Sequence, residues 1–298
     1  MLRDRMRVLT FFGFENRKKI FEIDSRYKFV CLTAGKLAEQ ESPPESFDAT
    51  FMRLDVEELE TGAPADALIT LNWAELESLS PGTLALLEFR SARDREIVVK
   101  MSGLKKGQEI RPLLGNQGTK SWGVHYYREF DMTNDKKLWT KSGGHLWTPS
   151  EVCGLRWPED PAIHFADVRV GMAAKGFWPL YEGKQIDQWL TDTKPIARWL
   201  SLETCKSENG KLPSPAPKLV FRDIARNTDE RTCIAAVLPV GSCSCNTLAT
   251  LRIEGISEEL AASVMNSLSF DYLVRPGSQS TAMDSRTTER LKSSRRMR

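Results

Sequence analysis

Alternating apolar and polar residues predict strands in three parts of the chain. Residues 20–33 alternate around a polar turn and are rich in β-branched and aromatic side chains, so we expect two short strands there. A further short strand is expected at 51–54. Residues 218–224 and 231–238 predict a second pair of strands, joined by a turn in which Asn, Thr and Asp favour chain reversal. Two strands alone do not make a stable sheet, so the first pair needs a partner surface.

Helical spacing is clearest at residues 257–273. Ser257 can accept hydrogen bonds from the first turn and so cap the helix. Leu260, Val264 and Leu268 recur every four residues, and we expect them to form the face through which the helix packs.

Shorter helices are expected earlier in the chain, at residues 71–87, where Pro and Gly break the pattern at 80–82. In the run 88–97, Arg90 and Arg93 stand at i,i+3 spacing and can share one helix face. Lys100, Lys105, Lys106 and Arg111 follow, and with them this is the most basic region outside the C-terminal tail. A solvated helix face and a nucleic-acid contact both explain these arginines, and the pattern leaves the two open.

Two segments look unlike folded core. Residues 41–65 are acidic, with consecutive prolines at 43 and 44, and predict a solvated linker; carboxylates that are merely adjacent in a polar run do not make a catalytic pair. Residues 276–298 are rich in Ser, Thr and Arg and poor in apolar side chains, which predicts a disordered basic tail.

Composition limits the function classes. The 298 residues are 41% hydrophobic and carry a formal net charge of +2, so nucleic-acid binding would need a local basic patch. No run approaches the about 18 apolar residues of a membrane span, and the first residues lack the apolar core of a signal peptide. We therefore expect a cytoplasmic protein with no membrane partner.

The cysteines and histidines predict no metal site. Only Cys243 and Cys245 lie close together, and neither a second cysteine pair nor a neighbouring histidine completes a zinc-binding pattern. We expect reduced thiols.

Most of the 8 tryptophans fall between Trp122 and Trp199. Aromatic side chains bury large areas, so most should lie in the core. One or two are expected at the surface, where a ring can stack on a base or sugar.

Two dense polar runs, residues 177–189 (FWPLYEGKQIDQW) and 221–232 (FRDIARNTDERT), stand out. Both combine aromatic rings, cationic or amide groups and a few carboxylates, the side chains that hold phosphates and read base edges. The acids of the second run either orient its arginines or hold the turn through internal ion pairs. The residues that we predict to contact DNA are Tyr181, Lys184, Gln188, Arg222, Arg226, Asn227 and Arg231.

Segments of these two runs and the residues that follow them also resemble a known protein family. The sequences PLYEGK, FRDIA, TDERT and IAAVLP, which begin at residues 179, 221, 228 and 234, resemble the C-terminal half of adenine-specific DNA methyltransferases of type IIG restriction-modification and BREX-like systems. Weaker similarity to the same proteins covers residues 14–29, 88–97 and 130–139.

The resemblance implies an α+β (mixed) chain with double-stranded DNA as its partner. Residues 1–40 would be trailing strands of a methyltransferase catalytic sheet, so that the chain starts inside a domain. Residues 66–275 would be a DNA target-recognition domain. The cofactor of the full-length family is S-adenosylmethionine.

The catalytic motifs of that family are absent from the sequence. The only paired prolines, in Ser-Pro-Pro-Glu at 42–45, lack the amide and the aromatic of the Asn-Pro-Pro-Tyr motif, and no Gly-rich cofactor turn is present. We therefore expect no cofactor and no catalytic residue in this chain, no methyl transfer by it alone, and a role beside a separate catalytic subunit. A self-contained enzyme with an unrecognised site and a decayed fragment remain as alternatives.

Overall fold

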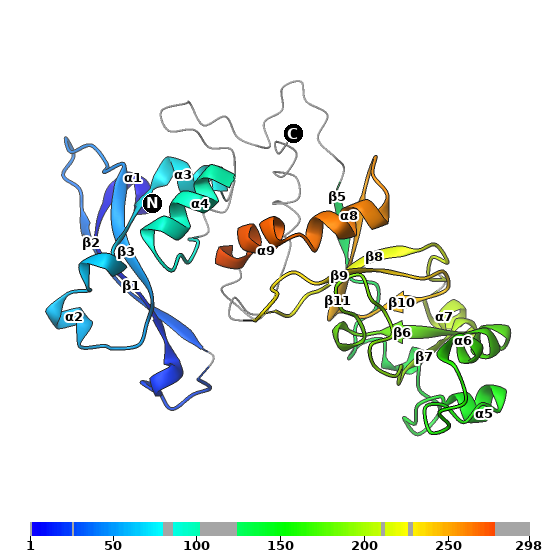
Figure 1. The fold of residues 1–298 in the computed structure, drawn as a ribbon. Coiled ribbons are helices and arrows are strands. Elements are labelled where there is room, and N and C mark those ends of the chain that lie inside the picture. The colour runs from blue at the N-terminus through cyan, green and yellow to red at the C-terminus, as the bar shows by residue number, and fades with distance from the viewer. Residues whose placement is uncertain are drawn as a thin grey trace. The chain divides into compact units, whose positions relative to one another are not determined.

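The structure is a computed structural model that describes residues 2–25, 27–79, 86–101, 124–209, 212–225 and 229–277. The chain divides into two compact units, with the division between Thr119 and Lys120 (Figure 1). Within the described residues, helices accompany three sheets, so the predicted α+β class is confirmed. In those same ranges, the helices are all too short or too polar to span a membrane.

The first unit holds a 4-stranded sheet with the order β2-β1-β3-β4. Strand β1 is antiparallel to β2 and parallel to β3, and β3 is antiparallel to β4. The strands are β1 (Met6–Glu15), β2 (Lys28–Lys36), β3 (Ser46–Arg53) and β4 (Ile69–Asn72). The helices are α1 (Leu2–Arg5), η1 (Asn16–Lys18), α2 (Glu58–Thr61), η2 (Ala65–Ala67), α3 (Trp73–Leu79) and α4 (Ala92–Met101).

The core of this unit forms around the inner strand β1. Its last residues, from Phe11 onward, are all buried: three are phenylalanines, and the carboxylate of the last, Glu15, is paired with Arg17 at 2.6 Å. The ring of Phe14 stacks on Phe29 of β2 with 5.1 Å between centroids, and Phe11 meets Phe51 of β3 at 5.7 Å.

The prediction of two strands within 20–33 was wrong for its first half. Only the second half enters β2, and the strand that pairs with it is β1, which lies earlier in the chain. Phe21 and Ile23 alternate like strand residues but are 50% and 52% exposed in a loop. The short strand expected at 51–54, within the predicted linker, is the end of β3, which begins earlier, at Ser46, and pairs with both β1 and β4.

The loop between β1 and β2 folds around the buried side chain of Asn16. Its amide oxygen accepts a hydrogen bond from the Phe21 amide at 2.9 Å, and its amide nitrogen donates to the Phe21 carbonyl at 3.0 Å. The Asn16 backbone N–H donates to the Tyr27 carbonyl at 2.9 Å. One polar side chain therefore supplies the hydrogen bonds that a strand partner would otherwise provide.

The second unit contains two further sheets, with the orders β10-β6-β7 and β5-β11-β8-β9. The strands are β5 (Val124–Tyr127), β6 (Phe177–Tyr181), β7 (Trp199–Ser201), β8 (Lys218–Arg222), β9 (Ala235–Leu238), β10 (Cys243–Ser244) and β11 (Leu248–Ile253). The helices are η3 (Lys136–Leu138), α5 (Pro149–Cys153), α6 (Phe165–Ala174), η4 (Gly183–Gln185), α7 (Leu202–Asn209), α8 (Glu258–Met265), α9 (Leu268–Val274) and η5 (Arg275–Gly277).

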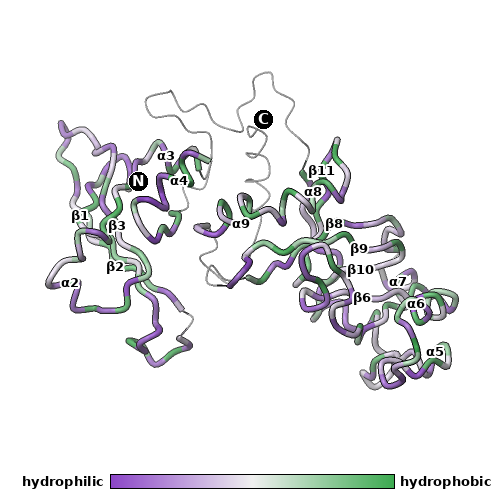
Figure 2. Tube along the Cα trace, in the orientation of Figure 1, coloured by the Kyte–Doolittle hydropathy of each residue, from purple (hydrophilic) through white to green (hydrophobic). Residues whose placement is uncertain are grey.

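One hydrophobic cluster joins both sheets of this unit. It contains Met172 of α6, Tyr181 of β6, Trp199 of β7, Val220 of β8 and Leu248 of β11, all of which are 0% exposed. Figure 2 shows the hydrophobic stretches of β8 and β9 that contribute to it. The predicted pair of strands at 218–224 and 231–238 is confirmed as β8 and β9, which pair antiparallel, although both strands are shorter than predicted.

The single helix predicted at 257–273 is two helices. Ser257 caps α8 as expected, accepting a hydrogen bond from the Leu260 amide at 3.3 Å, and Ser267 caps α9. The predicted packing face was wrong: Leu260 is 52% exposed and Leu268 is 77% exposed, whereas Ala261, Ala262 and Met265 are buried. The two helices are separated by a break in the helical structure, so the spacing of buried residues in the first does not continue into the second.

Replacing Asn16 by Ala tests the loop architecture of the first unit. The change removes the partner of the Phe21 N–H and C=O, and the net contribution of each hydrogen bond is about 0.5–1.5 kcal/mol, so we expect a loss of about 1–3 kcal/mol in the free energy of unfolding. Urea unfolding, read by hydrogen exchange in β1 and β2, measures it. Glu22→Ala, an exposed change in the same loop, is the control and should shift stability by less than about 0.5 kcal/mol. Equal stability of both variants would mean that Asn16 does not organise this loop.

Candidate nucleic-acid interface

The structure brings the two polar runs together through Arg222, at the end of β8. Its Nε donates to the Gly183 carbonyl at 2.8 Å, and its Nη2 donates to the carbonyl of Ile186. The guanidinium thus binds both ends of the short helix η4, which lies in the first run. Charge-assisted hydrogen bonds of this kind are stronger than neutral ones. Arg222, predicted to read bases, is therefore engaged within the protein.

Gly183 is required by a close approach inside the protein. A Cβ at this position would lie 3.0 Å from the Thr247 carbonyl oxygen, tighter than nine in ten real Cβ contacts. The Gly183 amide also donates to the Thr247 hydroxyl at 3.3 Å. In the structure this glycine allows the close approach of the residue before β11.

Tyr181 lies in the core rather than at the surface. Its side chain is 0% exposed, and its hydroxyl donates to Asp192 Oδ1 at 2.5 Å. Burial, and then this hydrogen bond to a carboxylate, raise the pKa of the Tyr181 phenol well above its usual range. The phenol stays protonated, and its ring offers no face to a ligand in this arrangement.

Gln188 and Arg231, one from each run, meet beside Asn266, which precedes α9. With its amide oxygen facing the guanidinium, Gln188 accepts from Arg231 Nε at 2.8 Å and Nη2 at 2.6 Å. Arg231 also donates to the Asn266 carbonyl, and its Nε lies 4.0 Å from Asp271 Oδ1. Both predicted contact residues are therefore held by neighbours within this unit.

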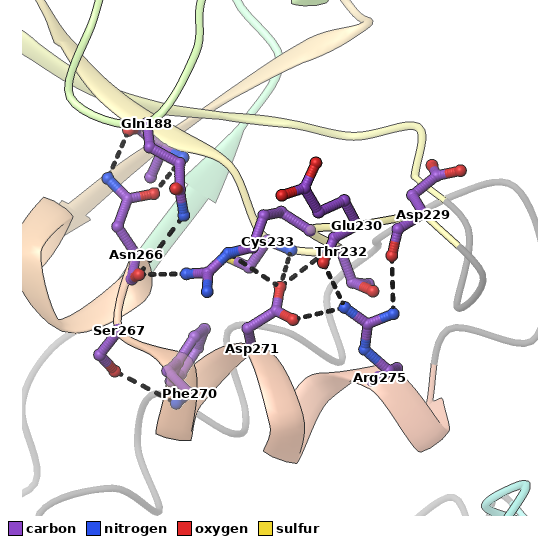
Figure 3. Close-up of polar contacts among 12 residues, drawn as sticks. Gln188, Asp229, Glu230, Thr232, Cys233, Asn266, Ser267, Phe270, Asp271 and Arg275 are labelled. Carbon is purple, nitrogen blue, oxygen red and sulfur yellow. Dashed lines mark hydrogen bonds and ion pairs between the residues drawn. The ribbon is translucent and has the colours of Figure 1, made fainter.

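The carboxylate of Asp271 is the centre of this network. It is only 4% exposed, and Oδ1 accepts from the backbone amides of Thr232 and Cys233, both at 2.7 Å. Oδ2 accepts from Arg275 at 2.7 Å, and the same arginine donates to the carbonyls of Asp229 and Glu230 at 2.7 and 3.0 Å (Figure 3). Helix α9 therefore fixes the backbone over 229–233.

Asn266 adds a second clamp on the same strand. Its side chain accepts from the Ala235 amide at 2.9 Å and donates to the Ala235 carbonyl at 2.8 Å, at the start of β9. The thiol of Cys233, buried beneath the network, has a pKa raised by burial and then by the Asp271 charge, so it is protonated. The chain that leaves the β8–β9 turn is thus fixed on both sides.

Among the acids of the second run, Asp223 forms an internal ion pair, which is one of the two roles that the sequence left open. The carboxylate of Asp223 accepts from Arg128, which follows β5, at 2.6 Å. Asp229 and Glu230 contribute backbone carbonyls to Arg275. Arg226 and Asn227, predicted to read bases, lie outside the described residues.

Lys184 is the predicted contact residue that remains open to solvent among those the structure describes. Its side chain is 50% exposed, and its Nζ lies 3.3 Å from Glu182 Oε2. Glu182 is also paired with Arg198, so its charge is already balanced. An exposed ion pair of this kind contributes little and can exchange for a phosphate.

Trp189 was not singled out by sequence reasoning. It lies 56% exposed in a tight turn closed by two hydrogen bonds between the backbones of Asp187 and Leu190, of 2.9 and 3.1 Å. Trp139 and Trp199, in contrast, are buried, as expected for most tryptophans. The backbone of Trp189 has φ +59°, a conformation unusual for a residue with a Cβ, and no residue type in the run signals it.

No constellation of three or more His, Cys, Asp or Glu side chains suited to a metal ion occurs in the described ranges. Cys243 and Cys245 are buried, and burial raises the pKa of both thiols. The chain matches no family model, and comparison with curated proteins finds no match.

Replacing Asp271 by Asn tests the clamp. The variant keeps the shape but removes the charge that faces Arg231 and Arg275, and breaking a buried charged pair of this kind costs about 3–5 kcal/mol. We expect lower stability in urea together with faster hydrogen exchange at the Thr232 and Cys233 amides. Glu203→Gln, an exposed change of the same chemistry in α7, should alter neither. Unchanged exchange at these two amides in Asp271→Asn would contradict the clamp.

Proposed function

We propose that this chain is the sequence-specific DNA-recognition portion of an adenine-specific DNA methyltransferase of a restriction-modification or phage-defence system. The observation that supports it is the joining of the two runs that carry the resemblance. Arg222 and the Gln188–Arg231 pair build them into one element, which leaves Lys184 and Trp189 exposed. Internal hydrogen bonds hold this element in shape, while a cation and an aromatic ring stay exposed. Such an arrangement suits a surface that contacts a nucleic acid.

Within this element the arginines have a positioning role. Arg222 and Arg231 donate hydrogen bonds to backbone carbonyls, and Arg231 also donates to Gln188. We therefore propose that these two arginines hold the surface in shape. Lys184 is the residue that we assign to a phosphate. Base reading by Arg226 and Asn227 stays a prediction.

Methyl transfer is assigned to a separate catalytic polypeptide in the cytoplasm. The sequence lacks the Asn-Pro-Pro-Tyr motif and the Gly-rich cofactor turn, so S-adenosylmethionine would be bound by that partner and not by this chain. The chain alone is proposed to be inactive as a methyltransferase.

Strand β2 offers a surface for such a partner. It lies at one end of the strand order of its sheet, and in the described residues it pairs with β1 alone. Its middle, residues 29–35, carries no charged side chain, and Val30 and Leu32 are 55% and 42% exposed; Leu9, on the neighbouring β1, is 58% exposed. A long, uncharged edge strand is a template for a strand of another chain, so we propose that the catalytic polypeptide pairs there.

Lys184→Ala tests the phosphate contact. We expect weaker binding of a random duplex pool and a slope of log K against log salt that is smaller by about 0.9, the value for one phosphate contact. Fluorescence anisotropy over a salt series measures both. Lys175→Ala, which removes an exposed lysine outside the run, is the matched control and should keep the wild-type slope. The same slope in Lys184→Ala and wild type would make this lysine a structural residue.

The partner surface can be tested in a coexpressed pair. The catalytic polypeptide is any chain that carries the missing Asn-Pro-Pro-Tyr motif and binds S-adenosylmethionine. Val30→Lys combined with Leu32→Lys places two charges at the edge strand, and we expect at least a tenfold weaker complex with unchanged unfolding. Leu59→Lys, at a 46% exposed position in α2, is the control. A complex as tight as wild type would exclude β2 as the contact.

A further inference from the structure

The indole of Trp189 is presented to solvent by a backbone that is held on three sides. Two hydrogen bonds between Asp187 and Leu190 close the turn, and the Trp189 amide donates to the Ala235 carbonyl at 3.1 Å. Beside it, the Gln188 side chain is held by Arg231. The turn is thus tied to the start of β9, which Asn266 clamps in turn.

The conformation of Trp189 is unfavourable for folding. At φ +59°, glycine or asparagine would be less strained than any aromatic residue. The exposed ring also gains little from burial, since 56% of the residue remains in contact with solvent. Strained residues with exposed apolar side chains are found where function requires them. Stability therefore does not account for a tryptophan here.

The acidic residues on either side of Trp189 in the sequence disfavour a phosphate at this turn. Asp187 and Asp192 flank the turn; Asp187 accepts from the Gln188 amide at 2.7 Å, and Asp192 accepts from Tyr181 and, at 3.1 Å, from Thr191. A phosphate placed beside these carboxylates would be repelled by their negative charge. The uncharged face of a nucleobase meets no such repulsion, and it stacks well on an indole.

We infer that Trp189 stacks on an unstacked nucleobase of the bound DNA, an inference that rests on the proposed function. The fixed turn lowers the entropy lost on binding, because the ring is already in place. Lys184, five residues earlier in the same run, supplies the phosphate contact that the acids beside Trp189 cannot. Stacking is largely independent of base identity, so Trp189 adds affinity to whatever sequence is read elsewhere.

Trp189→Asn separates binding from folding. Asparagine adopts positive φ more readily than tryptophan, so the full-length variant should unfold at equal or higher urea concentration. Loss of one stacked base is worth a factor of about 5–150 in affinity, and we expect binding of a random duplex pool to weaken within that range while the salt slope stays as in wild type. Trp189→Phe should keep most of the affinity. Leu268→Asn, at another exposed apolar position, is the control.

Tryptophan fluorescence supplies a second readout. Stacking should quench part of the wild-type emission on DNA binding, and Trp189→Phe should lack that part. Wild-type affinity in Trp189→Asn, with no change in quenching for Trp189→Phe, would overturn the inference while the proposed function stands. If DNA binding persists but the complex with the catalytic polypeptide is lost, Trp189 contacts protein and the inference is wrong. Wild-type protein that binds no DNA would overturn the proposed function and the inference together.

Discussion

The candidate interface depends on one buried carboxylate. Asp271 accepts hydrogen bonds from two consecutive backbone amides and faces two arginines, of which Arg275 holds the chain leaving the β8–β9 turn and Arg231 holds Gln188. Through Gln188 the same network reaches the turn that carries Trp189. A buried carboxylate is costly unless its oxygens are satisfied, so this arrangement tolerates little change at any of its members. The polar residues of the two runs thus shape a surface before any ligand arrives.

The sequence predicts the parts of this fold that depend on local pattern. The α+β class, the β8–β9 strand pair and the Ser257 cap follow from alternation and capping chemistry, and the structure confirms them. The strands at 20–33 and the packing face of 257–273 were wrong, because a loop built on the buried Asn16 and a break at Asn266 are decided by tertiary hydrogen bonds. Such bonds join residues that are distant in the chain, and no local period records them.

The candidate site shows the same limit. Residue types alone predicted that Tyr181, Gln188, Arg222 and Arg231 face a ligand, yet the structure places their polar groups against Asp192, Asn266 and backbone carbonyls. An arginine that can bind a phosphate can equally bind a carbonyl at the end of a short helix. The spacing of Asp271 and Arg275, at i,i+4, was a readable signal of an internal pair. No feature of the sequence signalled the positive φ of Trp189.

Hydrogen exchange of the full chain with and without duplex DNA tests the central claim most directly. If the joined runs form the DNA-binding surface, saturating duplex should slow exchange in residues 183–190 and in the β8–β9 turn, and high salt should abolish the effect. Amides in β1 and β3 of the first unit, remote from these runs in sequence, should exchange at the same rate in both states. Protection that appears elsewhere while residues 183–190 exchange unchanged would contradict the account.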